Sequence, residues 1–209
     1  MKVLLVNGSP NKEGCTYTAL TEVADTLNKN GVDTEIFWIG KKPVSGCIAC
    51  RKCAEIGKCV FDDLVNQCAE KAEQCDGFIF GSPVYFASAN GSMTSFMDRL
   101  FYSLLLAGKS LAGKPAAAVV SCRRGGNTAT FDQMNKYFSI CKMPIVTSQY
   151  WNMVHGNSPE EVKQDLEGLQ TMRTLGQNMV WLLQCIEAGK QAGIELPVYE
   201  APVRTNFVR

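Results

Sequence analysis

The sequence predicts an α/β domain built on an open, doubly wound parallel sheet. Two observations support this fold class. Short, almost continuous apolar runs occur along the chain, as expected for parallel strands that helices cover on both faces. Between these runs lie longer segments in which apolar residues recur at helical spacing. Alternation of strand and helix favours a doubly wound sheet over separate layers of strands and helices.

Five segments are predicted strands, and we expect them to form one five-stranded sheet. Four of them are apolar runs that suit the interior of a sheet. The fifth, residues 34–38, is more polar and suits an edge strand. The four apolar runs are residues 2–6, 77–82, 116–121 and 144–148.

Five helices are predicted in the intervals between and after the strands. The first carries apolar residues on one face between Leu20 and Leu27, and Asn30-Gly31 is a typical helix end. The last begins at Ser158-Pro159-Glu160-Glu161, which supplies a cap, a proline at the first helical position and an acidic first turn. The predicted helices cover residues 16–30, 62–74, 91–106, 127–141 and 159–188.

Composition narrows the function classes. The 209 residues include 21 basic and 20 acidic side chains, and a net charge of +1 gives no reason to expect binding to nucleic acid or to an anionic membrane. No apolar run approaches the length of a membrane span, and the polar Asn7-Gly8 interrupts the N-terminal run too early for a signal peptide. We therefore expect a cytoplasmic protein. Without repeats or linkers, residues 1–209 are predicted to form one domain that ends in an irregular tail, 196–209.

Ten cysteines need an explanation in a chain expected to stay in a reducing compartment. Four of them crowd into a cysteine-rich loop, residues 45–61, with the spacing C-x2-C-x2-C-x5-C. The four are Cys47, Cys50, Cys53 and Cys59. The other six are scattered, and most are expected to be buried as small hydrophobic side chains.

The four crowded thiols leave several chemistries open: disulfides, zinc, an iron–sulfur cluster, or burial without any ligand. The compartment disfavours disulfides. Structural zinc usually takes two ligand pairs set apart in sequence, unlike this tight series. The spacing resembles a [4Fe–4S] binding loop, although Val60 stands where the bacterial ferredoxin run has proline and the last interval is longer.

The loops that follow the strands are the predicted ligand site, because doubly wound sheets bind ligands beyond the carboxyl ends of their strands. In residues 7–20, two glycines and the hydroxyls of Ser9 and Thr16 lie at the start of a helix, a pattern typical of a phosphate site and also of an ordinary turn. In residues 81–99, an apolar stretch can either stack against a flat ring or simply cap the core. In residues 121–134, Gly125-Gly126 indicates a close backbone approach, and the neighbouring arginines are either solvated or in contact with an anionic ligand.

Taken together, GSPNKEGCT, GSPVYF…NG…FMDR and SCRRGGNTATFDQ resemble the flavodoxin-like fold. More narrowly, they resemble the family of NAD(P)H-dependent FMN reductases and iron–sulfur flavoproteins, over roughly residues 1–155. The resemblance implies FMN, with its phosphate on Ser9, Asn11, Cys15 and Thr16. It places the isoalloxazine ring against Pro83, Val84, Tyr85 and Phe86, with Ser121, Arg124, Gly125 and Gly126 near the ring or its edge. One departure is Cys15, where the family usually has asparagine, a better side-chain donor.

The same resemblance implies a [4Fe–4S] cluster on Cys47, Cys50, Cys53 and Cys59, passing single electrons to or from the flavin. A related reductase that keeps this loop without metal, or as a labile redox pair, is the alternative.

The resemblance also implies an FMN-dependent oxidoreductase. It would draw electrons from NAD(P)H or ferredoxin and deliver them to a quinone, a flavin or oxygen. The alternatives are a non-enzymatic electron carrier of flavodoxin type and a redox sensor.

The family is generally dimeric or tetrameric, so a homo-oligomer is expected. No residue is assigned a catalytic role, because the cofactor performs the chemistry. The segment with Tyr150, Trp151, Asn152 and His155 borders the family's flavin pocket, which makes these residues candidates for a substrate pocket.

Overall fold

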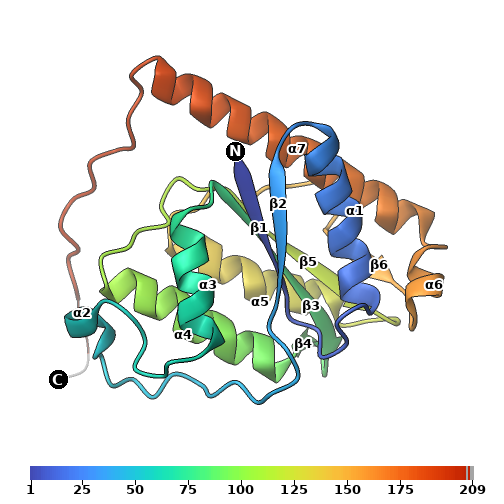
Figure 1. The fold of residues 1–209 in the computed structure, drawn as a ribbon, viewed down its shortest axis with the longest axis horizontal. Helices are drawn as coiled ribbons and strands as arrows, with labels where there is room; N and C mark the ends of the chain where they lie inside the picture. The colour runs from blue at the N-terminus through green and yellow to red at the C-terminus, as the bar shows by residue number, and fades with distance from the viewer. Residues whose placement is uncertain (206, 208–209) are drawn as a thin grey trace.

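The computed structural model describes residues 1–205 and 207 and confirms the flavodoxin-like α/β fold (Figure 1). Its parallel strands lie in the order β2-β1-β3-β5-β6, which is the 2-1-3-4-5 order of a flavodoxin-like sheet when only these five are counted. A sixth strand, β4, pairs antiparallel with the end of β3. The strands are β1 (Lys2–Asn7), β2 (Asp33–Trp38), β3 (Gly77–Tyr85), β4 (Ser88–Ala89), β5 (Ala116–Cys122) and β6 (Met153–His155).

Helices cover both faces of the sheet, which explains why the strands are apolar without alternation. In β1, Val3 and Leu5 face one core while Leu4 and Val6 face the other, since successive side chains point to opposite faces. The first core is closed by α1 (Cys15–Lys29), α6 (Pro159–Val162) and α7 (Leu166–Gln191). The second is closed by α3 (Leu64–Glu73), α4 (Gly91–Leu106) and α5 (Asn127–Ile140), and the short α2 (Cys53–Ile56) lies against α4.

The predicted strand at 144–148 is wrong. Only one isolated bridge, between Ala116 and Ile145, joins this segment to the sheet. Beyond it the chain bonds to α7 instead: Asn178 donates to the Thr147 carbonyl at 2.8 Å, and the Ser148 hydroxyl donates to the Thr171 carbonyl at 2.7 Å. The fifth parallel strand is β6, which pairs with the carboxyl end of β5.

The predicted helix over 159–188 is two helices. Helix α6 ends at Val162 and α7 begins at Leu166. Asp165 is the N-cap of α7, and its carboxylate accepts a hydrogen bond from the Gly168 amide at 2.9 Å. Helix α7 then runs to Gln191. An acidic N-cap inside a predicted helix is a restart signal that periodicity alone overlooks.

The remaining predicted helices and the edge strand are confirmed to within a few residues. No helix among residues 1–205 and 207 is long and apolar enough to cross a membrane. The predicted irregular tail has neither helix nor strand over its described part, 196–205 and 207, while residues 206, 208 and 209 lie outside the described residues.

Candidate functional site

The loop after β1 is fixed by its own buried side chains. Asn7 is fully buried; its Oδ1 accepts from the Ser9 amide at 3.0 Å, and its Nδ2 donates to the Lys12 carbonyl at 2.9 Å. The Ser9 hydroxyl accepts from the Asn11 amide at 3.1 Å, and the Trp38 indole donates to the Ser9 carbonyl at 2.8 Å. These bonds hold the loop in one shape.

Helix α1 begins with an open end. Its N-cap is Gly14 in extended conformation, which supplies no side-chain hydrogen bond to the first turn. Amides in the first turn of a helix have no acceptor within the helix, so they and the helix dipole favour an anion. This end of α1 therefore fits the predicted phosphate of FMN.

Two predicted phosphate residues direct their side chains elsewhere. The Cys15 thiol lies 3.6 Å from the Gly156 carbonyl, and burial raises its pKa, so it stays neutral. The buried Thr16 hydroxyl is 2.8 Å from the Ser121 hydroxyl. That bond joins the start of α1 to the end of β5, and it brings two of the predicted cofactor residues together.

Asn90 is a site residue that the sequence analysis missed. Its Nδ2 donates to the Gly8 carbonyl at 2.7 Å, and its Oδ1 caps α4 by accepting from the Met93 amide at 3.0 Å. The Gly8 amide in turn donates to the Gly81 carbonyl at 2.8 Å. The available signal was an asparagine directly before a predicted helix, but its second partner lies 82 residues away in sequence.

The predicted ring-stacking wall is a hairpin rather than a loop. Pro83, Val84 and Tyr85 continue β3, and Phe86 and Ala87 form the turn to β4 with φ of 52° and 58°. Two consecutive left-handed residues are typical of a type I′ hairpin turn. Phe86 is completely exposed and Tyr85 half exposed, which leaves their rings free to contact a ligand or another chain.

The Gly-rich loop after β5 touches this hairpin. Gly126 has a φ of 85°, and a Cβ at this position would lie 2.7 Å from the Cα of Ala87. Pro83 is the register partner of Ser121 across β3 and β5. The structure thus brings the three predicted loops to one edge of the sheet, while Asn11, Arg124 and Gly125 are exposed at its rim.

These features fit FMN: an uncapped helix end for a phosphate, buried hydroxyls beside it, and exposed aromatic side chains for a flat ring. The assignment of each cofactor residue stays a prediction.

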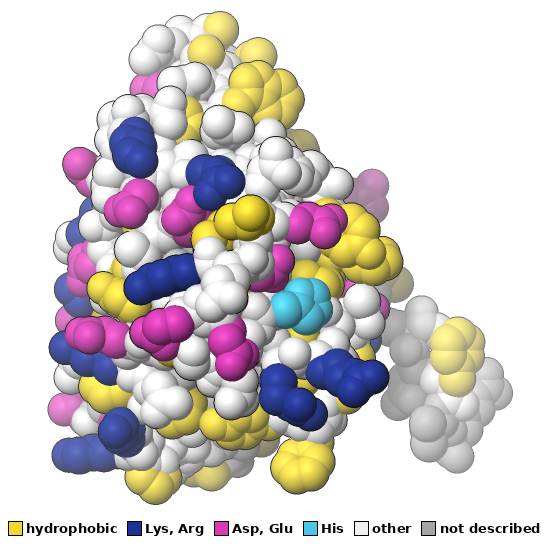
Figure 2. All heavy atoms as spheres, turned by 90° about the vertical axis from the view of Figure 1, so that its right-hand side faces the viewer, with side chains coloured by type: hydrophobic (Ala, Val, Ile, Leu, Met, Phe, Trp, Pro, Cys, Tyr) yellow, Lys and Arg dark blue, Asp and Glu magenta, His cyan; other side chains and the backbone are white. Residues whose placement is uncertain are grey.

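The segment before β6 borders a separate cavity of about 230 Å³, lined by Tyr150, Trp151 and His155 among others. The His155 Nδ1 lies 3.6 Å from the Asp165 carboxylate, and its Nε2 lies 3.2 Å from the Asn127 amide nitrogen. Figure 2 shows the chain's single histidine at the surface of this face, with basic side chains beside it. The fourth candidate, Asn152, is buried instead, and its side-chain amide has no partner within the described residues.

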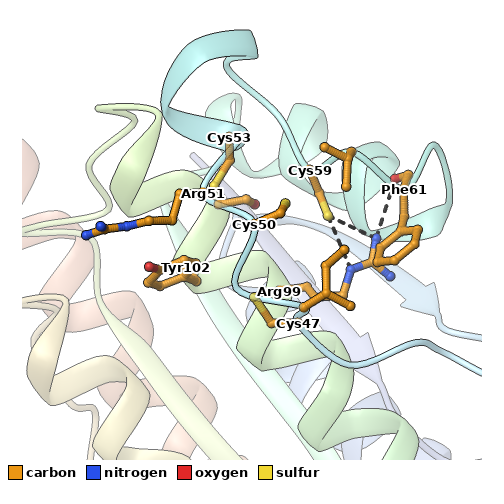
Figure 3. Close-up of a pocket in the computed structure, with 11 residues that line it drawn as sticks. Cys47, Cys50, Arg51, Cys53, Cys59, Phe61, Arg99 and Tyr102 are labelled. Atoms are coloured by element: carbon orange, nitrogen blue, oxygen red, sulfur yellow. Dashed lines mark hydrogen bonds between the residues drawn. The ribbon is translucent and has the colours of Figure 1, made fainter.

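The four crowded cysteines line a common cavity over α4 (Figure 3). Cys47 and Cys50 are exposed, Cys59 is half-buried and Cys53 is buried, which raises the pKa of the Cys53 thiol. All ten cysteines are free. On either side of Cys50, Ala49 and Arg51 adopt left-handed φ values of 52° and 61°. Such backbone strain tends to occur at functional loops.

As a donor set, four thiols around one cavity fit an iron–sulfur cluster better than a carboxylate-binding metal. The cavity is only about 20 Å³, and among residues 1–205 and 207 no three metal-ligating side chains lie close enough to hold a metal ion.

A buried arginine closes the floor of this cavity. The Arg99 side chain is fully buried on α4 and forms a bidentate ion pair with Asp63 at 2.7 and 2.8 Å. Its Nε and Nη2 both donate to the Cys59 sulfur at 3.3 Å. Burial acts to lower the pKa of Arg99, but Asp63 and Cys59 outweigh it and raise that pKa. In the sequence, Arg99 belongs to the FMDR motif, which by itself does not indicate a role for it.

Comparison with known proteins identifies relatives over most of the chain. The model of the NADPH-dependent FMN reductase family matches residues 1–158. An iron–sulfur flavoprotein of Methanocaldococcus jannaschii is 34% identical over 194 residues, covering 90% of this chain and 100% of that protein. An iron–sulfur flavoprotein of Methanosarcina thermophila is 27% identical over 195 residues, covering 91% and 99%.

Solved structures agree on the fold. A flavone reductase superposes with a TM-score of 0.67 at 16% identity, over 90% of this chain and 64% of that one. A flavodoxin from the domain Archaea superposes with a TM-score of 0.59 at 14% identity, over 88% and 99%. Identities this low support the fold alone.

Proposed function

Because the chain belongs to the NADPH-dependent FMN reductase family, we propose that it binds FMN at the carboxyl edge of its sheet and is an oxidoreductase. It takes electrons from NAD(P)H or ferredoxin and delivers them to a small acceptor. With a quinone as acceptor, NAD(P)H, one proton and the quinone give NAD(P)⁺ and the quinol. Two reduced ferredoxins can supply the same two electrons one at a time.

The observation that carries the proposal is the open N-terminus of α1 on the same edge of the sheet as the aromatic hairpin. Ser9, held by Asn7 and Trp38, keeps the loop in place for a phosphate. Gly126 lets the loop after β5 approach the hairpin closely. When bound, FMN supplies the redox chemistry by accepting a hydride equivalent and returning electrons singly or in pairs. The chain's own residues bind and orient it.

We extend the proposal to the cysteine-rich loop, where Cys47, Cys50, Cys53 and Cys59 would hold a [4Fe–4S] cluster. Support comes from their shared cavity and from the names of the relatives, which are iron–sulfur flavoproteins. Such a cluster supplies one-electron transfer beside a two-electron flavin.

An electron carrier without turnover is the second candidate, favoured by the likeness of the fold to flavodoxin. Phe86, completely exposed at the hairpin tip, and Trp181, 65% exposed on α7, also suit contacts between copies of the chain in a homodimer or homotetramer.

The test is anaerobic purification followed by an absorbance spectrum, iron and sulfide analysis, and donor assays. We expect flavin bands, about four irons per chain, and NAD(P)H oxidation coupled to quinone reduction. Reduction only by a ferredoxin system favours the carrier, and a colourless protein contradicts the proposal. Phe86→Ala is expected to weaken FMN retention, whereas Ile140→Ala, an exposed apolar side chain on α5, serves as the matched control.

A further inference from the structure

Of the four cysteines, Cys59 alone is anchored on both its backbone and its sulfur. Asn66 is buried; its Oδ1 accepts from the Cys59 amide, and its Nδ2 donates to the Cys59 carbonyl, both at 3.0 Å. The Cys59 sulfur accepts from two nitrogens of Arg99. Cys47 and Cys50, by contrast, lie in an exposed stretch without helix or strand.

Arg99 also joins the two ends of the cysteine-rich loop. Its Nη1 lies 3.5 Å from the Ser45 carbonyl and its Nη2 lies 3.4 Å from the Phe61 carbonyl, where both nitrogens can donate. The guanidinium lies 4.8 Å from the centre of the Phe61 ring (Figure 3). A planar group with five donors suits this geometry, which a lysine could not reproduce.

Asp63 fixes the guanidinium in this position. The same carboxylate accepts from the Val65 amide at 3.0 Å and so caps α3. Asp63 also balances the charge of Arg99, so the pair places two N–H donors against the Cys59 sulfur with little net charge.

We propose that Arg99 is a positioning and tuning residue for the group that the four thiols hold, keeping the Cys59 sulfur in place and raising the reduction potential of that group. This inference rests on the proposed function, since it requires the cluster. The physical reason is that N–H donors to a ligating sulfur stabilise the more negative, reduced state. Donors that are buried and fixed in advance act more strongly than donors exposed to water.

A purely structural ion pair would be the alternative role for Arg99. The two roles predict different changes in the reduction potential when Arg99 or Asp63 is replaced. Arg99→Gln removes the forked donor and the positive charge, so the potential falls. Asp63→Asn keeps the helix cap, because asparagine caps as well as aspartate, but it leaves the charge of Arg99 unopposed, so the potential rises. A purely structural role does not predict that the two substitutions shift the reduction potential in opposite directions.

The experiment is a redox titration of anaerobically purified protein, followed by electron paramagnetic resonance, with iron and sulfide measured on each sample. For Arg99→Gln we expect the oxidised-to-reduced ratio at a fixed potential to rise about tenfold, equivalent to about 59 mV for a one-electron couple. For Asp63→Asn we expect a shift of opposite sign. Arg173→Gln is the control, because it removes the same charge from an ion pair with Glu22 that joins α7 to α1 on the other face of the sheet.

Iron analysis separates the two possible failures. A wild-type protein without iron defeats the cluster assignment, and this inference falls with it. A wild-type protein with full iron whose potential moves in neither variant, or moves the same way in both, overturns the role of Arg99 alone. If Arg99→Gln fails to fold or to retain iron, Asp63→Asn decides: an unchanged or lower potential overturns the inference.

Discussion

The carboxyl edge of the sheet, where the loop after β1, the hairpin and the loop after β5 meet, is called the flavin edge below. It differs from the cysteine-rich loop in how its residues are held in place, although both are predicted to hold a redox group. At the flavin edge, Asn7, Thr16, Asn90 and Ser121 are all buried. Asn7 bonds within the loop after β1, Thr16 joins α1 to Ser121 on β5, and Asn90 joins the start of α4 to Gly8. In the cysteine-rich loop, all residues from 45 to 52 are exposed, and the hydrogen bonds of the buried Asn66 and Arg99 converge on one cysteine, Cys59.

The two sites therefore differ in how many of their residues are held in place by hydrogen bonds. The polar groups of the flavin edge satisfy one another and leave one helix end open. In the cysteine-rich loop, hydrogen bonds anchor one thiol, Cys59, while Cys47 and Cys50 are exposed. We therefore expect substitutions at the flavin edge to change protein stability, and substitutions in the loop to change metal retention first.

The largest effect is expected from a substitution that disrupts the contact between the loop after β5 and the hairpin. Gly126→Ala places a Cβ against Ala87 at a left-handed φ, so we expect a loss of about 2 kcal/mol in the free energy of unfolding. FMN binding should weaken by about tenfold. Urea unfolding and flavin titration measure the two effects.

The matched control for Gly126→Ala is the same substitution at the neighbouring Gly125. Gly125 has open space around its Cα, so Gly125→Ala should change the free energy of unfolding by less than about 0.5 kcal/mol. Equal effects of the two substitutions would remove the steric explanation.

An intermediate effect is expected at the hydroxyl pair of Thr16 and Ser121. Either Thr16→Val or Ser121→Ala leaves one buried hydroxyl without this partner, at a cost of about 1–2 kcal/mol. The double variant leaves neither hydroxyl, so it should cost about 1 kcal/mol less than the sum of the single variants. Urea unfolding of flavin-free protein gives the three values, and strict additivity would mean that the pair does not couple α1 to β5.

The smallest expected effect is at Glu35 on β2, the strand that precedes the cysteine-rich loop in sequence. Hydrogen bonds from Lys2 and Lys71 hold the pKa of this carboxyl below its ordinary value of 4.5, joining β2 to α3 on either side of the loop. A carboxyl with a lowered pKa stabilises the fold above its ordinary pKa and loses that contribution as the pH falls through the lowered value.

Because these charges are partly exposed, Glu35→Gln should cost at most about 1 kcal/mol at pH 7. The difference from wild type should vanish in acid. Unfolding curves at several pH values check this, with Glu195→Gln, an exposed residue directly before the tail, as the charge control. A difference that persists at low pH would exclude the ion pair as its cause.

Sequence reasoning succeeded where the signal was local. The runs at β1, β3 and β5 and the periodic helices were recognisable because burial on both faces imposes a pattern on neighbouring residues. It failed at 144–148, where the side chains of Asn178 and Ser148 tie the backbone to α7. An apolar run does not reveal which partner its backbone will choose.

The sequence by itself determined the fold class, the family and the crowding of four thiols, because apolar periodicity, glycine-rich turns and cysteine spacing are properties of short stretches. Only the tertiary structure decided that Asn90 bonds Gly8, that Thr16 meets Ser121, and that Arg99 lies against Cys59. These partners are 40 to 105 residues apart in sequence. The physical reason is that a buried polar group must find a partner, and the identity of that partner depends on which elements pack together.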